Sequence, residues 1–274
     1  MDALISKIAA WFTEFKAVFI LCFIDDNRGQ YLLKGLKNTL TITLFALLLG
    51  VFIGVVIAIV RSTHDKNAAT MRPGPLRVIL KIANFICKVY LTVIRGTPVV
   101  IQLLIMYFII LISVRDGVFV AALTFGINSG AYVAEIIRGG IMSIDKGQFE
   151  AGRSLGFNYV QTMWYIVIPQ AFKNVLPSLA NEFIVLLKET SISGYVGIMD
   201  LTRGGDIIRG RTFQAFMPLF AVALIYLILV MFFTWLVERL ERRLRNSDGI
   251  HHEPKKVRLT DLRPGGTQED GHER

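Results

Sequence analysis

Long apolar runs alternate with short polar segments along this chain. The run 38–60 holds 23 residues without a charge, and the run 212–237 holds 26. At 1.5 Å per residue, either run is long enough to cross an apolar layer of about 30 Å as a helix. The pattern therefore predicts an all-α protein that spans a membrane.

A third apolar run, 79–112, is too long for one straight span and too short for two. Its interruptions are Lys81, Lys88, Arg95 and Pro98. We predict one long helix that is broken at Gly96-Thr97-Pro98. Non-helical backbone at membrane depth is tolerated only inside protein or beside a wet cavity, so Arg95 and Gln102 are candidates for a translocation path. An arginine that snorkels to the interface is the alternative for Arg95.

Two further spans, 117–137 and 164–187, carry polar residues. The second holds Glu182 at mid-depth, with Asn181 beside it. A carboxylate that faces lipid costs several kcal/mol, so Glu182 is expected to face a cavity or a partner. An ion pair with Lys173 or with an arginine is the structural alternative to a role of Glu182 and Asn181 in a translocation path.

The charge pattern orients these five spans. The formal net charge is +9, and the basic residues gather in the segments 61–77 and 238–245. Because basic loops stay on the cytoplasmic side, we predict an N-terminus outside and a C-terminus inside. The segment 188–211 is then an external loop, in which Gly194, Gly197, Gly204 and Gly205 predict sharp turns. The basic residues are not interleaved with aromatic ones, which argues against a nucleic-acid partner.

The two ends of the chain differ from its middle. Residues 1–30 have apolar positions at helical spacing and scattered charges, which predicts an amphipathic helix on the membrane lipid surface. Residues 31–245 form the transmembrane domain, and residues 246–274 are polar and predicted to be a disordered cytoplasmic tail. The two cysteines and four histidines show no disulfide or metal-ligand spacing, so no metal is expected.

A polar segment, 143–163, stands out in this apolar chain. Residues 147–155 suit a short helix, Gly156 suits a left-handed C-terminal position, and Asn158 suits the N-cap of a second helix that Pro169 kinks or interrupts. We therefore predict a helix, a tight turn and a helix that a partner contacts. The candidate contact residues are Glu150, Ala151, Gly152, Leu155, Gly156 and Asn158.

This segment resembles the signature loop of the inner-membrane permease subunits of ABC importers. That loop reads Glu-Ala-Ala, three residues, Gly, nine residues, Ile-x-Leu-Pro, and this chain departs from it at Gly152 and Ile168. Gly152 is expected to weaken the helix by roughly 1 kcal/mol relative to alanine. Other segments resemble the polar amino-acid branch of the family: 36–40 (LKNTL), 94–98 (IRGTP), 132–141 (YVAEIIRGGI), 169–171 (PQA) and 187–191 (LKETS).

The resemblance covers about residues 31–245 and implies a type I ABC importer permease in the bacterial cytoplasmic membrane. It implies that 143–163 is a coupling loop that docks on ABC ATPase subunits. It also implies an extracytoplasmic solute-binding protein and a second permease subunit, in a homodimer or a heterodimer. The chain has no G-x-x-x-x-G-K-[ST] motif, so ATP and magnesium belong on the partner ATPase, and this subunit is not expected to be an enzyme.

The substrate implied by the resemblance is a polar amino acid. The segment KETSISGY and the intramembrane Glu182 favour a cationic one, such as arginine, lysine or histidine. Glutamine, glutamate and cystine are the alternatives on the same scaffold. A pore or a membrane scaffold that is not coupled to ATP is the alternative of another class.

Overall fold

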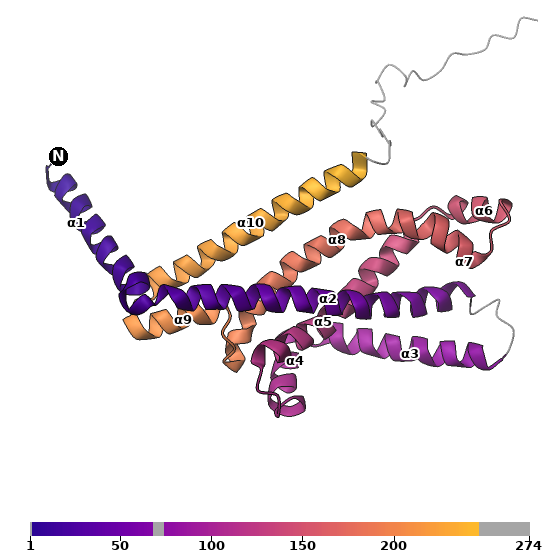
Figure 1. Cartoon of the computed structure of the whole chain (residues 1–274), viewed down its shortest axis with the longest axis horizontal. Coiled ribbons are helices and arrows are strands. Elements are labelled where there is room, and N and C mark those ends of the chain that lie inside the picture. The colour runs from indigo at the N-terminus through magenta and orange to yellow at the C-terminus, as the bar shows by residue number, and fades with distance from the viewer. Residues whose placement is uncertain (1, 68–73, 247–274) are drawn as a thin grey trace, which may run out of the picture.

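The computed structural model describes residues 2–67 and 74–246, and within these ranges the regular structure is helical. The α-helices are α1 Asp2–Phe19, α2 Gly29–Asn67, α3 Pro75–Gly96, α4 Val99–Ile105, α5 Gly117–Met142, α6 Lys146–Ser154, α7 Tyr159–Thr162, α8 Ile168–Glu189, α9 Leu201–Thr212 and α10 Phe216–Asn246 (Figure 1). Short π-helical turns cover Ile20–Ile24, Met106–Ile110 and Met163–Val167, and 3-10 turns cover Asp25–Asn27 and Thr190–Val196. The predicted tail, from residue 247 onward, and part of the predicted 61–77 loop lie outside the described residues.

The centre of the molecule is the contact of α2 with α5. Glycines at four-residue spacing line both helices there, Gly50 and Gly54 on α2 and Gly126 and Gly130 on α5. A Cβ at Gly54 would lie 2.8 Å from the Cβ of Val133, so only glycine allows this approach. Fully buried side chains of α2, α5 and α8 continue the core, among them Ile42, Phe125 and Leu186.

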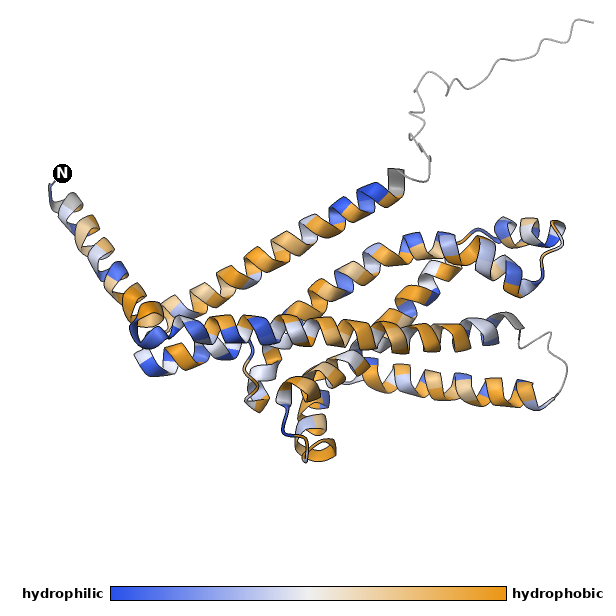
Figure 2. Cartoon of the chain, viewed as in Figure 1, coloured by the Kyte–Doolittle hydropathy of each residue, from blue (hydrophilic) through white to orange (hydrophobic). Residues whose placement is uncertain are grey.

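Three described helices are long and apolar enough to cross a membrane: α2, α5 and α10. The α3–α4 pair passes the same test as one broken span, bent by 105°. The helix α10 is apolar over most of its length, whereas the α6–α7 region is largely hydrophilic (Figure 2). The helix α8 has a sufficient length of 22 residues, but its polar side chains exclude it from this set. Three crossings, or four with the bent pair, follow from length and composition, and the fifth stays a prediction.

The predicted break in the third apolar run is confirmed. The helix α3 ends at Gly96, Thr97 and Pro98 are extended, and α4 begins at Val99. The side-chain amide of Gln102 donates to the carbonyl of Ile94 at 2.8 Å and to the hydroxyl of Thr97 at 2.8 Å. These bonds replace helical partners that the break removes.

The predicted boundaries of other elements need correction. The span predicted at 38–60 is part of a helix that runs from Gly29 to Asn67, and the one at 212–237 continues to Asn246. Charged residues set the ends of both predicted spans, but a helix continues through a charged residue that reaches solvent or has an ion-pair partner, as Arg61 has in Glu135. The predicted kink at Pro169 takes the form of the π-helical turn Met163–Val167, after which α8 continues.

The segment 188–211 is predicted as an external loop, but most of it is helical, in the 3-10 turn Thr190–Val196 and in α9. Gly197 does lie in a turn, with φ 78°. Gly204 and Gly205 are instead buried inside α9, and a Cβ at Gly204 would lie 2.6 Å from the carbonyl oxygen of Tyr31. These two glycines serve close helix packing rather than turns, which their local sequence does not distinguish.

Asp200 is the N-cap residue of α9, and it is fully buried. It accepts hydrogen bonds from the backbone N–H groups of Thr202 and Arg203, at 2.9 and 3.1 Å. Burial nevertheless raises the pKa of this carboxyl above its ordinary value, because desolvation outweighs the hydrogen bonds. Ionised Asp200 therefore caps the helix at a cost in folding free energy.

Asparagine removes the buried charge but keeps only one of the two accepting oxygens, so we expect Asp200→Asn to lie within about 1 kcal/mol of the wild type in stability at neutral pH. A raised folded-state pKa means that the penalty is present at neutral pH and disappears as the pH falls through that pKa. The thermal stability of the wild type relative to that of Asp200→Asn should therefore rise as the pH is lowered from 7. Asp200→Ala should lose about 1 kcal/mol at pH 7. Thermal unfolding of the three proteins in detergent at several pH values tests this, and a wild type that loses ground on acidification contradicts it.

Candidate functional site

The polar segment forms the predicted helix, turn and helix at the opposite end of the molecule from α1 and α9 (Figure 1). Asp145 caps α6 by accepting from the N–H of Gly147 at 2.6 Å. Gly156 has φ 80° and ends the helix in the left-handed region. Asn158 caps α7 in a reciprocal pair with Gln161, in which each side chain accepts from the other's backbone N–H at 2.9 Å. The local geometry predicted for this segment is thus confirmed.

The surface of this segment is available to a partner. Of the six candidate contact residues, Glu150, Ala151, Leu155, Gly156 and Asn158 are exposed, and Gly152 is buried. Large apolar side chains are exposed beside them: Leu155, Val160, Trp164 and Tyr165, each 66% to 71% exposed. Apolar side chains gathered among polar ones on an exposed tip are typical of a protein interaction site.

The glycine at position 152 is explained by the close packing of α6 on α7. A Cβ at this position would lie 2.7 Å from Cγ2 and 2.8 Å from Oγ1 of Thr162, so α6 packs directly on the end of α7. The departure from the family pattern therefore brings the two short helices together. Glycine thus lowers the helix propensity of α6 and at the same time allows α6 to approach α7 closely.

We expect Gly152→Ala to disturb the α6–α7 contact, although alanine is the better helix former. The double variant Gly152→Ala, Thr162→Ala removes both Thr162 atoms that the new methyl group meets, and it should recover wild-type stability. The single change should cost about 1–3 kcal/mol. Unfolding midpoints of wild type, both single variants and the double variant give the coupling; additive effects of the two changes contradict the contact.

Glu182 lies on α8, on the side that contacts α5, and is 8% exposed. Its Oε1 accepts a hydrogen bond from the hydroxyl of Ser129 at 2.8 Å. The predicted carboxylate is therefore inside protein rather than against lipid, with a neutral donor on the neighbouring helix.

Asn181 points elsewhere, because it is exposed while its neighbour Glu182 is buried. It belongs to a row of exposed polar residues on one face of α8, which we call the α8 polar stripe: Asn174, Ser178, Asn181 and Lys188. Their spacing of four, three and seven places them on one helical face. Polar side chains along a membrane-length helix face water or protein rather than lipid.

The two path candidates at the broken helix differ in their surroundings. Gln102 is engaged at both ends, since its Oε1 also accepts from the Asn128 amide at 3.0 Å. The structure thus gives it a stabilising role at the break. Arg95 is exposed, and its guanidinium carbon lies 5.5 Å from the centre of the Tyr132 ring. It borders an open pocket of about 440 Å³ lined by Arg61, Lys88, Leu91, Thr92, Arg95, Gly96 and Glu135.

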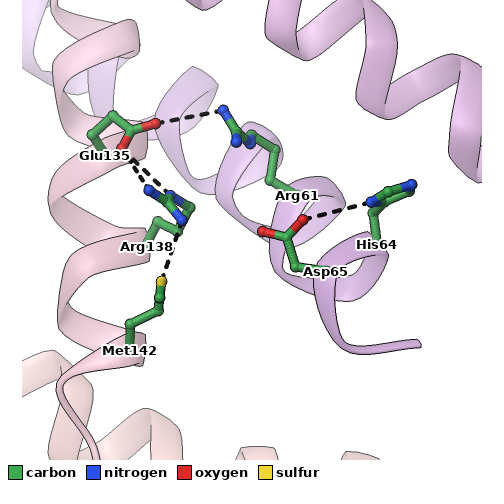
Figure 3. A network of polar contacts seen from close by, with 6 residues as sticks. All are labelled: Arg61, His64, Asp65, Glu135, Arg138 and Met142. Atoms are coloured by element: carbon green, nitrogen blue, oxygen red, sulfur yellow. Dashed lines mark hydrogen bonds and ion pairs between the residues drawn. The ribbon is translucent and has the colours of Figure 1, made fainter. Parts of the chain in front are cut away.

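An ion-pair network beside this pocket was not predicted (Figure 3). Glu135 on α5 pairs with Arg61 on α2 at 3.5 Å and with Arg138 at 3.1 Å. Arg138 also contacts the sulfur of Met142 at 3.2 Å. The spacing of Glu135 and Arg138 was a usable local signal, but the pairing with Arg61 joins two distant segments. The network ties α2 to α5 near the end of α2.

Comparison with known proteins adds independent findings. The model of the family "Binding-protein-dependent transport system inner membrane component" matches residues 67–246. A putative glutamine transport system permease protein of Rickettsia felis is 39% identical over 217 residues, which cover 78% of this chain and 93% of that protein. The glutamine transport system permease protein of Escherichia coli K12 is 37% identical over 218 residues, with the same coverage.

Solved structures agree with this comparison. The crystal structure of an amino acid ABC transporter with histidines matches with a TM-score of 0.69 and 39% identity, covering 78% of this chain and 94% of that one. An inward-facing methionine ABC transporter matches with a TM-score of 0.65 at 20% identity, covering 78% of this chain and 96% of that one, and supports the fold alone.

Proposed function

Because this chain belongs to the family of inner membrane components of binding-protein-dependent transport systems, we propose that it carries an uncharged polar amino acid of the glutamine class into the cytoplasm. The expected resemblance to amino-acid ABC permeases is confirmed. The chain is a multi-pass inner-membrane permease subunit of an amino-acid ABC importer and is not an enzyme. ATP hydrolysis belongs to a separate ATPase subunit.

The substrate proposal rests chiefly on the relatives that carry glutamine in their names. The sequence-based preference for a cationic amino acid finds no support among them. That preference relied on the segment KETSISGY and on Glu182. Glu182 is buried against Ser129, whereas the exposed polar faces carry Lys88, Arg95 and Lys188. Glutamate and cystine are the remaining alternatives, which a transport assay separates.

We propose five crossings, with the N-terminus outside and the C-terminus inside. The helix α8 is the added crossing, because the α8 polar stripe would face a second permease subunit across a shared path instead of lipid. The polar loop would then lie in the cytoplasm, where its exposed residues dock on an ATPase that holds ATP and magnesium. The region of α9 would lie outside, toward a solute-binding protein.

The test is reconstitution of the purified permease with the ATPase and binding protein that co-purify with it. In proteoliposomes we expect ATP-dependent uptake of labelled glutamine in preference to glutamate, cystine and arginine. Preferential arginine uptake would overturn the substrate proposal. Solute passage by the permease alone, without ATPase or ATP, would instead establish the uncoupled pore.

The change Glu182→Gln tests whether this carboxylate takes part in transport. Glutamine keeps the size of the side chain and an oxygen that accepts from Ser129, but it removes the charge that would bind a substrate ammonium group when the path opens. We expect uptake to fall at least about tenfold, which corresponds to about 1.4 kcal/mol. Co-elution with the ATPase should be unchanged. Wild-type uptake by an assembled variant would assign Glu182 a packing role.

A further inference from the structure

The helix α3 carries a regular row of cations, which we call the basic stripe: Arg77, Lys81, Lys88 and Arg95. Lys81, Lys88 and Arg95 follow at intervals of seven residues, close to two helical turns, so they share one face. From Arg77 to Arg95 the stripe is about 27 Å long at 1.5 Å per residue. Arg61 ends the apolar run of α2 and lines one pocket with Lys88 and Arg95, so this part of the stripe lies beside the end of that run.

A second exposed face of α3 has the opposite character. Ile82, Phe85, Ile86, Val89 and Val93 are 46% to 66% exposed and suit contact with lipid tails. Arg77 and Lys81 lie beyond the level of Arg61 and can snorkel to the interface, whereas Arg95 lies about 10 Å past Lys88, beside the apolar part of α2. At Arg95 the basic face of α3 consequently borders water or protein.

The pocket described above lies along this stripe and has a positive balance of charge. Arg61, Lys88 and Arg95 line it, against the single carboxylate of Glu135. That carboxylate is shared by Arg61 and by Arg138, at 3.5 and 3.1 Å. It therefore leaves the charges of Lys88 and Arg95 largely uncompensated in the pocket.

We infer that the basic stripe forms a water-filled wall of the translocation path, with Lys88 and Arg95 attracting the α-carboxylate of the passing amino acid and disfavouring a cationic side chain. A path wall with this charge concentrates anionic groups and repels cationic ones. The stripe thus sets a charge preference in the permease itself. The identity of the transported amino acid rests on the proposed function. The access of water to the wall and its positive potential do not depend on that function.

A cysteine at Thr92 reports both properties, because Thr92 is exposed and lines the pocket between Lys88 and Arg95. The background is Cys87→Ser in the assembled complex in nanodiscs, since Cys87 is the less buried of the two native cysteines. The probes are two methanethiosulfonates of similar size, one with a sulfonate and one with a trimethylammonium group. Ile86→Cys, on the apolar face at 61% exposure, is the control.

We expect the anionic probe to modify Thr92→Cys roughly tenfold faster than the cationic probe. The ratio should fall toward one when Lys88→Gln and Arg95→Gln are added, and Ile86→Cys should react slowly with both probes. Slow reaction of Thr92→Cys with both probes would show a wall covered by lipid or protein and overturn the inference. Equal fast rates would show a wet wall without the proposed potential and overturn it as well.

A transport arm connects the wall to the cargo. Lys88→Glu and Arg95→Glu together should lower glutamine uptake in proteoliposomes roughly tenfold, while the ATPase activity stimulated by loaded binding protein persists. Unchanged uptake would overturn the role of the stripe. If the wild type itself does not import glutamine, the proposed substrate is wrong. The ratio of the two probe rates still tests, independently of the substrate, whether the wall is open to water and positively charged.

Discussion

Replacing Gly156 with valine should weaken binding of the ATPase subunit about tenfold or more. Gly156 has φ 80°, and no atom lies within 4 Å of a Cβ built on it. A side chain there would clash with nothing, but the backbone conformation would be strained. An L-residue in this region costs about 1–2 kcal/mol, and a β-branched one is an outlier there. The turn would open and change the relative positions of Leu155 and Asn158. Titration of the purified permease with the ATPase in detergent measures the effect.

Gly156→Asn is the matched control, because asparagine enters the left-handed region more readily than other residues. It should keep binding within a few-fold of the wild type. If valine and asparagine weaken binding equally, the glycine itself touches the ATPase and the conformation of the turn is not the cause. If neither change has an effect, the loop is not the docking site.

Replacing Gly35 with alanine should separate α2 from the start of α9. A Cβ at Gly35 would meet the carbonyl oxygen of Asp200 and would lie 2.7 Å from its carbonyl carbon and 2.8 Å from the Cα of Leu201. These are backbone atoms that hydrogen bonds hold in place: the N–H of Leu201 donates to Thr39 at 3.1 Å, and the Asn38 amide donates to the Met199 carbonyl at 2.8 Å. We expect a loss of about 2–3 kcal/mol in unfolding free energy.

Gly210→Ala is the control for Gly35→Ala, because Gly210 lies in α9 with nothing within 4 Å of its Cβ position. Alanine there should leave stability unchanged or raise it by up to about 1 kcal/mol. Thermal unfolding in detergent compares the two variants with the wild type. A Gly35→Ala protein as stable as Gly210→Ala would show that α2 and α9 can move apart without loss.

Features set by a few neighbouring residues could be predicted from the sequence. The break at Gly96-Thr97-Pro98 follows from proline chemistry, and the turn at Gly156 and the cap at Asn158 follow from helix-end preferences. Each of these signals acts within a few residues. The long apolar runs likewise predicted helices, because backbone groups in a membrane must pair within the helix.

Features set by distant contacts could not be predicted. The residues next to Gly204 do not distinguish it from a turn glycine. Its role in packing depends on the carbonyl of Tyr31, which is far away in the chain. The burial of Glu182 depends on Ser129, and the position of Arg61 depends on Glu135. The seven-residue spacing of Lys81, Lys88 and Arg95 was present in the sequence, but its interpretation needed the exposed and buried faces of α3.

The helical turns after Asn158 run without interruption through α7, Met163–Val167 and α8 to Glu189. This run of 31 residues is about 46 Å long. One end adjoins the exposed loop that begins at Asp145, and the other adjoins the segment before α9. The π-helical turn Met163–Val167 separates a short first part from α8, and α8 alone is about 33 Å long, so a tilt of about 5° at its start displaces its far end by roughly 3 Å. With the proposed docking site and orientation, small motions of the ATPase would therefore move the segment before α9 without any change in the intervening side chains.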